Sequence, residues 1–157
     1  MEQTEQNATD KIIDKNQDIQ SSQLTKDTPE QKKPVKPPKP EDKPFEQFIN
    51  EELIPSFTKE LESRGIFINE MSLLEQMRPV VGGTCSCLFA NIDNGRRIWL
   101  CFCQKKITSI KSICLSERGS EPSLIESFLI DEKKTTLSLL ISRLLQRLNG
   151  QKWLEAN

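Results

Sequence analysis

The sequence predicts an α+β fold: an amphipathic N-terminal helix, an antiparallel meander of four to five strands, and a C-terminal amphipathic helix packed on the sheet. Apolar residues recur at three- and four-residue steps over 45–61 and again over 137–148, the spacing of helices that bury one face. Between these two segments, alternating stretches are separated by turn-forming residues. All nine aromatic residues and all five cysteines fall within 44–157, so the core must form there.

Residues 1–43 lack the composition of a folded domain. They hold seven apolar residues and no aromatic residue, cysteine or glycine, which is too little apolar surface to offset chain entropy. Nine acidic and eight basic residues nearly balance, and five of the nine prolines lie in 29–40. We therefore expect a disordered charged tail over 1–43 with a Lys/Pro-rich linker, followed by a single globular domain over 44–157.

The Lys/Pro-rich linker, residues 32–40, has the composition of a stiff polyproline-II segment. Its PxxP spacing could dock in an aromatic-lined groove of another protein. Its lysines could also make peripheral contact with an anionic membrane surface. A solvated spacer is the simplest interpretation, because Glu30, Glu41 and Asp42 flank the lysines.

The first helix is expected to begin at Pro44, since proline is tolerated in the first turn of a helix. Gly65 is expected to end it. Pro55 lies inside the apolar stripe and cannot donate a backbone hydrogen bond, so we expect a kink near 51–55 or a break into two short helices.

Strands are expected over 70–78, 84–92, 96–104 and 107–116, with a glycine-containing turn at 80–83. Residues 123–130 are ambiguous between a strand and a helical turn, and the strand is favoured. Segments 84–92 and 96–104 flank Asp93-Asn94-Gly95 and form the clearest hairpin in the chain.

The register of this hairpin decides which cysteines share a face. A three-residue turn with Gly95 in the left-handed conformation places Phe89 opposite Trp99 and pairs the cysteines with one another. A two-residue turn pairs Asn91 with Ile98 instead. The first register is favoured because it places residues of similar character opposite each other, aromatic with aromatic and cysteine with cysteine. It predicts that four thiols, those of Cys85, Cys87, Cys101 and Cys103, lie on one face of the sheet.

The last helix has an apolar stripe that includes Leu140, Leu144 and Leu148, and Asn149-Gly150 ends it. Asp131 is the expected N-cap. Trp153 is expected to fold back onto the edge of the core.

Three interpretations of the four thiols remain open. Free cysteines usually act as small apolar residues, and this interpretation is favoured. A metal site is the second, although CxC spacing differs from the CxxC turns of zinc sites and side chains on a flat sheet diverge. Thiol-dependent redox chemistry is the third, although no CxxC motif lowers a thiol pKa. We assign no metal ligand, with Cys85, Cys87, Cys101 and Cys103 as weak candidates.

Several classes of function are excluded or disfavoured by composition. The chain contains no histidine, which excludes Ser-His-Asp and Cys-His catalytic systems. A net charge of -1 offers no basic field for nucleic acid. No apolar run reaches the roughly 18 residues of a membrane span, and residues 1–10 do not resemble a secretory signal. We expect a cytoplasmic protein without a cofactor or catalytic residues.

Three segments carry a family resemblance: Pro40–Ile49, Glu121–Glu132 and Arg147–Leu154. Together they resemble an uncharacterised cyanobacterial and plastid family catalogued as domain of unknown function 2996, over about 40–154. The resemblance implies an organism with oxygenic photosynthesis and a cytoplasmic setting, the cyanobacterial cytosol, where the thylakoid surface is one place the protein could act. It supplies no catalytic residue.

The expected function is a non-enzymatic binding or accessory module with a protein partner, which assists assembly or maintenance of a photosynthetic complex. Two alternatives stay open. The first is a redox or metal-binding protein that uses the hairpin thiols. The second is a small-molecule sensor with a pocket between the sheet and the helices.

Overall fold

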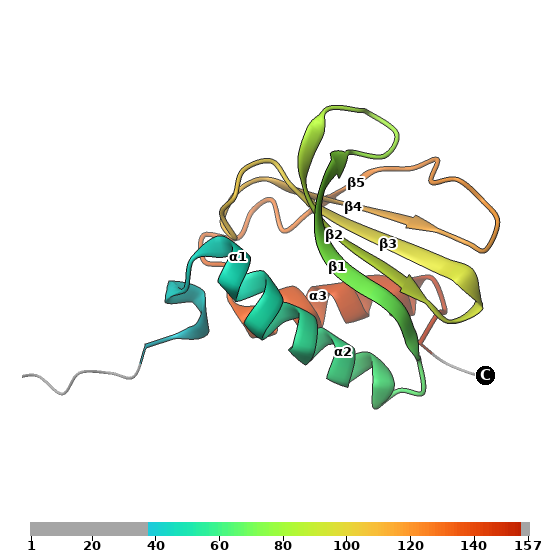
Figure 1. Cartoon of the computed structure of the whole chain (residues 1–157), viewed down its shortest axis with the longest axis horizontal. Helices are drawn as coiled ribbons and strands as arrows, with labels where there is room; N and C mark the ends of the chain where they lie inside the picture. The colour runs from blue at the N-terminus through green and yellow to red at the C-terminus, as the bar shows by residue number, and fades with distance from the viewer. Residues whose placement is uncertain (1–37, 155–157) are drawn as a thin grey trace, which may run out of the picture. The chain divides into compact units, whose positions relative to one another are not determined.

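The computed structural model describes residues 38–154, so residues 1–37 of the predicted tail 1–43, with most of the Lys/Pro-rich linker, lie outside them. Figure 1 shows one antiparallel sheet with helices on one of its faces. The strands are β1 (Ile68–Met77), β2 (Thr84–Ile92), β3 (Arg96–Phe102), β4 (Lys111–Ser116) and β5 (Glu126–Phe128), and they lie in the sheet in chain order. The predicted α+β meander is therefore confirmed.

The N-terminal helix is built from consecutive segments of different pitch. After a short 3₁₀ turn, η1 (Pro40–Asp42), come α1 (Phe45–Gln47), the π-helical segment η2 (Phe48–Leu53) and α2 (Ile54–Glu62). The N–H of Ile54 donates to the carbonyl of Ile49, five residues earlier. Pro55 has no N–H, and its ring would collide with the carbonyl four residues back in a regular α-helix. The predicted irregularity at 51–55 is thus present as a wide turn that lets the helix continue.

The hairpin register is confirmed. Cys87 pairs with Cys101 and Phe89 pairs with Trp99 across β2 and β3. The connection, η3 (Asp93–Gly95), has both Asn94 (φ 61°) and Gly95 (φ 73°) in the left-handed region. Asparagine and glycine adopt this conformation at low cost, which explains why Asn94 and Gly95 occupy this turn.

Two strands, β4 and β5, are at least four residues shorter than predicted, whereas the boundaries of β1 and β3 differ from the prediction by only one or two residues. The strand expected over 107–116 begins only at Lys111, because residues 107–110 fold around the buried Lys111 side chain. Its ammonium donates to the carbonyls of Ile107 and Ser109, each at 2.8 Å. The segment 123–130 does contain a strand, but β5 covers only three of its residues.

The N-cap of α3 (Leu137–Gly150) is Thr136, so the expected cap at Asp131 is wrong. The Thr136 hydroxyl accepts a hydrogen bond from the N–H of Leu139 at 3.3 Å. The Glu41 carboxylate accepts from the N–H of Leu137 at 2.8 Å, across 96 positions of sequence. A negative charge is favourable at this end of a helix, and here it comes from η1.

The main core lies between the sheet and the helices. Its fully buried side chains include Phe48 and Phe57 from the first helix, Leu100 and Ile113 from the sheet, and Leu144 from α3. Trp153 folds back after α3 as predicted and is buried. Its indole N–H donates to Glu117 at 2.6 Å. Within residues 38–154, no helix is both long and apolar enough to cross a membrane.

Candidate functional site

The cysteines lie on the face of the sheet opposite the helices. Leu88, Leu100 and Ile113 point into the helix-covered core, so the alternating positions of β2, β3 and β4 must point the other way. A second buried cluster forms on that opposite face from Cys87, Cys101, Cys114 and Trp99. The sheet therefore has two packed faces, and the smaller one is rich in sulfur.

Three of the four predicted thiols come together. The sulfur atoms of Cys85, Cys87 and Cys101 all lie within 4.8 Å of one another, and the Cys85 and Cys87 sulfurs are 3.4 Å apart. Same-face positions two residues apart on a strand are separated by roughly 6.7 Å along the chain. The two side chains therefore lean toward each other, contrary to the divergence expected of a flat sheet.

The remaining cysteines are arranged differently from the sequence expectation. Cys103 is exposed, and its sulfur lies 3.9 Å from the Arg78 guanidinium instead of joining the group of three. Cys114 is buried on the same face, because β4 pairs it with Trp99. Only the register between β3 and β4 places Cys114 on this face, so its position could not be assigned from the sequence.

The three clustered thiols have different acidities. Cys101 hydrogen-bonds Cys87 and lowers the pKa of Cys87 to about 7 against the opposing effect of burial. Burial, followed by the neighbouring Cys87, raises the pKa of Cys85 to about 11. The pKa of Cys101 is also raised, chiefly by its hydrogen bond to Cys87 and by burial. The cluster thus favours one thiolate, at Cys87, with its neighbours as donors.

The same face carries buried polar atoms that lack a hydrogen-bond partner among the described residues. They are Ser72 Oγ, Gln76 Nε2, Asn91 Oδ1 and Ser112 Oγ. Each belongs to a position that pairs with a residue of this face: Ser72 with Phe89, Gln76 with Cys85, Asn91 with Arg97, and Ser112 with Cys101. Buried polar groups are normally paired, so this concentration marks the face as unusual.

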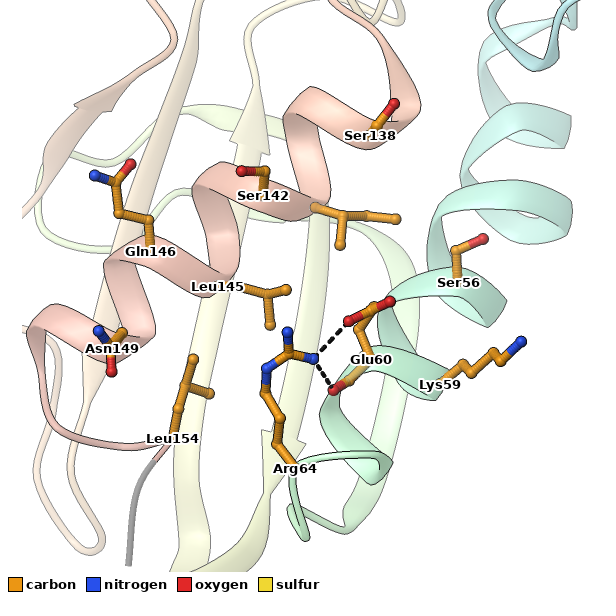
Figure 2. A pocket seen from close by; sticks show the side chains of 11 residues that line it. Ser56, Lys59, Glu60, Arg64, Ser138, Ser142, Leu145, Gln146, Asn149 and Leu154 are labelled. Atoms are coloured by element: carbon orange, nitrogen blue, oxygen red, sulfur yellow. Dashed lines mark hydrogen bonds and ion pairs between the residues drawn. The ribbon is translucent and has the colours of Figure 1, made fainter. Parts of the chain in front are cut away.

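A groove of about 990 Å³ opens on the other side of the molecule, between α2 and α3. Its apolar lining consists of the half-buried Ile141, Leu145 and Leu154. Figure 2 shows small serine side chains along both helices that border it, Ser56 on α2 and Ser138 and Ser142 on α3. Small residues on facing helices leave room for a further segment of chain between them.

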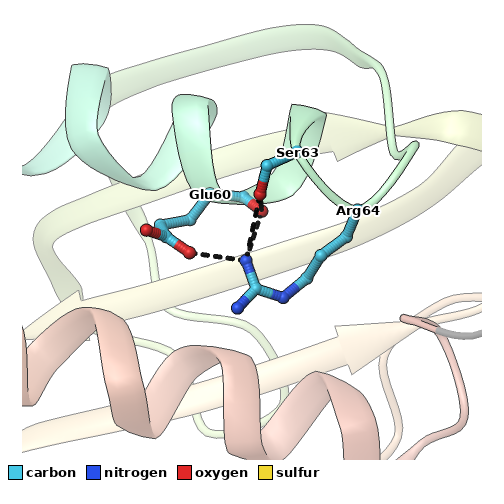
Figure 3. A network of polar contacts seen from close by, with 3 residues as sticks. All are labelled: Glu60, Ser63 and Arg64. Atoms are coloured by element: carbon cyan, nitrogen blue, oxygen red, sulfur yellow. Dashed lines mark hydrogen bonds and ion pairs between the residues drawn. The ribbon is translucent and has the colours of Figure 1, made fainter.

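Arg64 extends into this groove from the end of α2. Its Nη1 atom donates to the carbonyl of Glu60 at 2.6 Å and to the Glu60 carboxylate at 2.5 Å, with Ser63 Oγ at 3.3 Å. Figure 3 shows that these contacts all converge on one nitrogen of the guanidinium. Within the described residues, the Nε and Nη2 atoms make no hydrogen bond and remain available as donors.

The comparisons with known proteins agree with the resemblance described above. No curated protein matches the sequence. Residues 39–155, which include both the thiol cluster and the groove, match the family described as "Protein of unknown function (DUF2996)". Because this match covers most of the chain, the protein belongs to the DUF2996 family.

Proposed function

We propose that the protein is a non-enzymatic binding module that assists the assembly or maintenance of a photosynthetic complex. Its partner is a subunit that places an amphipathic helix in the groove between α2 and α3. The observation that carries the proposal is the groove itself, which combines an apolar lining with a guanidinium that has donors to spare.

The shape of the groove suits a helix. Two helices border it, and their serines permit close approach of a third backbone, while Leu145 and Ile141 offer apolar contact. The partner helix therefore needs small or medium apolar residues at three- and four-residue steps.

The charge in the groove adds a requirement on the partner. Glu60 occupies only one nitrogen of Arg64, and the pair of donors at Nε and Nη2 matches the two oxygens of a carboxylate. We therefore expect an acidic residue beside the apolar stripe of the partner helix.

The photosynthetic setting is supported by the family resemblance, which also favours the cytosol and the thylakoid surface. The Lys/Pro-rich linker serves in this proposal as a tether with peripheral contact to an anionic membrane. Lysines near such a surface contribute about 1 kcal/mol each.

The groove is tested by replacing Ser142 with arginine, whose long side chain fills the space a helix would take. Ser120→Arg is the matched control, since Ser120 is an exposed serine that does not line the groove. Both full-length variants and the wild type are used for affinity co-purification from photosynthetic cells. We expect the wild type and the control to recover the same photosynthetic subunits. With Ser142→Arg, the amount of these subunits recovered should fall at least tenfold. Equal recovery by Ser142→Arg contradicts docking in the groove, and recovery of no photosynthetic subunit contradicts the function.

The tether is tested separately on the full chain, with Lys32, Lys33 and Lys36 replaced by glutamine. Co-sedimentation with vesicles that contain anionic lipid should fall in the variant and should fall for the wild type when salt is raised. Equal sedimentation of both proteins contradicts a membrane role for these lysines.

A further inference from the structure

We propose that Cys85, Cys87 and Cys101 bind one Cu⁺ ion as a three-coordinate thiolate site on the face of the sheet opposite the helices. This site is independent of the groove and of the partner proposed for it.

The sulfur geometry fits a metal ion with little rearrangement. With metal–sulfur bonds of about 2.3 Å, the sulfurs of a trigonal site lie about 4.0 Å apart. The three sulfurs lie within 4.8 Å of one another, and those of Cys85 and Cys87 are 3.4 Å apart, so this pair must separate by only about 0.6 Å to reach the trigonal spacing. β2 supplies two ligands and β3 supplies the third, which the paired strands hold in place.

The ligand set selects the metal. Three thiolates without histidine or carboxylate form a soft site, which favours Cu⁺ and zinc over harder cations. Structural zinc takes four ligands, and no fourth sulfur of the described residues belongs to the group: Cys103 is exposed beside Arg78, and Cys114, although buried on the same face, lies outside the three clustered sulfurs. Cu⁺ accepts three thiolates, so the geometry favours copper.

The surroundings of the thiols suit a negatively charged metal–thiolate group. Gln76 Nε2 is a buried donor on the strand position opposite Cys85; it makes no well-formed hydrogen bond within the described residues, yet it lies near enough to Cys87 to help lower the pKa of that thiol. Sulfur in a metal–thiolate group accepts hydrogen bonds, which would satisfy this donor. Arg78 lies close enough for its positive charge to act toward a lower pKa at Cys85 and Cys87, which favours their thiolate forms.

The three ligands differ in exposure, so that one of them gives the copper ion a route to the site while the other two are shielded from water. Cys87 and Cys101 are 0 % and 1 % exposed, whereas Cys85 is partly exposed and gives an approach for the ion. Phe89, Trp99 and Cys114 pack around the buried ligands and limit water at the sulfurs. Binding forms three copper–sulfur bonds, and each ligand that still carries a proton releases it to solvent: Cys85 and Cys101 release one each, and Cys87 releases one only where it is not already a thiolate. The oxidation states of copper and sulfur do not change.

The test is anaerobic titration of the reduced full-length protein with Cu⁺ in the presence of a competing Cu⁺ chelator. We expect one Cu⁺ per chain and protection of the three thiols from alkylation, mapped by mass spectrometry. Cys85→Ser should weaken Cu⁺ binding at least 100-fold. Cys103→Ser, outside the group, should leave it within threefold of the wild type. Circular dichroism checks that each variant is folded, and thiol protection in the wild type needs no variant.

Each other outcome overturns the proposal. Absence of stoichiometric Cu⁺ binding by the wild type does so directly. So does protection of Cys103 in place of Cys85, or an equal loss of binding in both variants. Tighter binding of Zn²⁺ that requires Cys103 would replace the site by a four-thiolate zinc site. A disulfide between Cys87 and Cys101 in the anaerobically reduced protein would also contradict it.

Discussion

Replacing Leu144 by alanine tests whether the apolar stripe of α3 is part of the core. Leu144 is 0 % exposed in the cluster between helices and sheet. The change removes three carbon atoms, which at about 0.8 kcal/mol per methylene amounts to about 2.4 kcal/mol of transfer free energy. The cavity left behind adds to this loss, because the surrounding structure relaxes only in part. We expect the free energy of unfolding to fall by about 3–5 kcal/mol.

Urea denaturation measures this loss, with the fluorescence of Trp99 and Trp153 as the signal because both side chains are buried. The midpoint should fall while the dependence on urea concentration stays the same. Leu145→Ala is the matched control on the next residue. Leu145 is half-buried on the groove and should cost about 1 kcal/mol.

Two results would refute this reasoning. A cost within about 0.5 kcal/mol for Leu144→Ala, as at surface sites, would mean that this stripe does not support the core. An equal cost for Leu145→Ala would mean that the lining of the groove is core, which would remove its apolar surface from partner binding.

Three further predictions concern polar contacts. Arg147 donates to Glu126 and lowers the pKa of that carboxyl from its ordinary 4.5, so the unfolded chain binds the proton more tightly. The contribution of this ion pair to folding stability is present above about pH 4.5 and is lost as the pH falls through the lowered pKa. Thermal melts should therefore show that the wild type loses more stability than Glu126→Gln between about pH 5 and pH 3. Glu41→Ala removes the acceptor at the Leu137 N–H and should cost about 1 kcal/mol in urea denaturation, and no measurable cost would contradict this cap. Lys111→Met leaves two loop carbonyls without their donor and should cost about 1–3 kcal/mol; a stabilised variant would show that burying the ammonium outweighs its hydrogen bonds.

The sequence was sufficient for features that depend on short-range rules. The hairpin register followed from side-chain alternation and from Asn94-Gly95, whose left-handed conformations close the turn. Pro55 predicted an irregular first helix because its missing N–H is a property of the residue itself. The stripe through Leu144 predicted the buried face of α3 for the same kind of reason.

Other features were decided only by segments that the fold brings together. The sequence placed the cap of α3 at Asp131, whereas the N-cap is Thr136; the second contribution to this helix end, from Glu41, comes from 96 positions away from Leu137. It likewise did not show that Lys111 is buried, since the burial arises where β4 pairs this residue with Phe102 of β3 and Phe128 of β5.

The thiol cluster could be predicted from the sequence only in part. Alternation determined that Cys85, Cys87 and Cys101 share a face of the hairpin, because the side chains of a strand alternate with period two. Only the tertiary structure decided that their sulfurs meet, that Cys103 stands apart beside Arg78, and that Cys114 joins the face. The physical reason is that a strand fixes the side of each residue, whereas side-chain direction depends on packing against the neighbouring strands and loops.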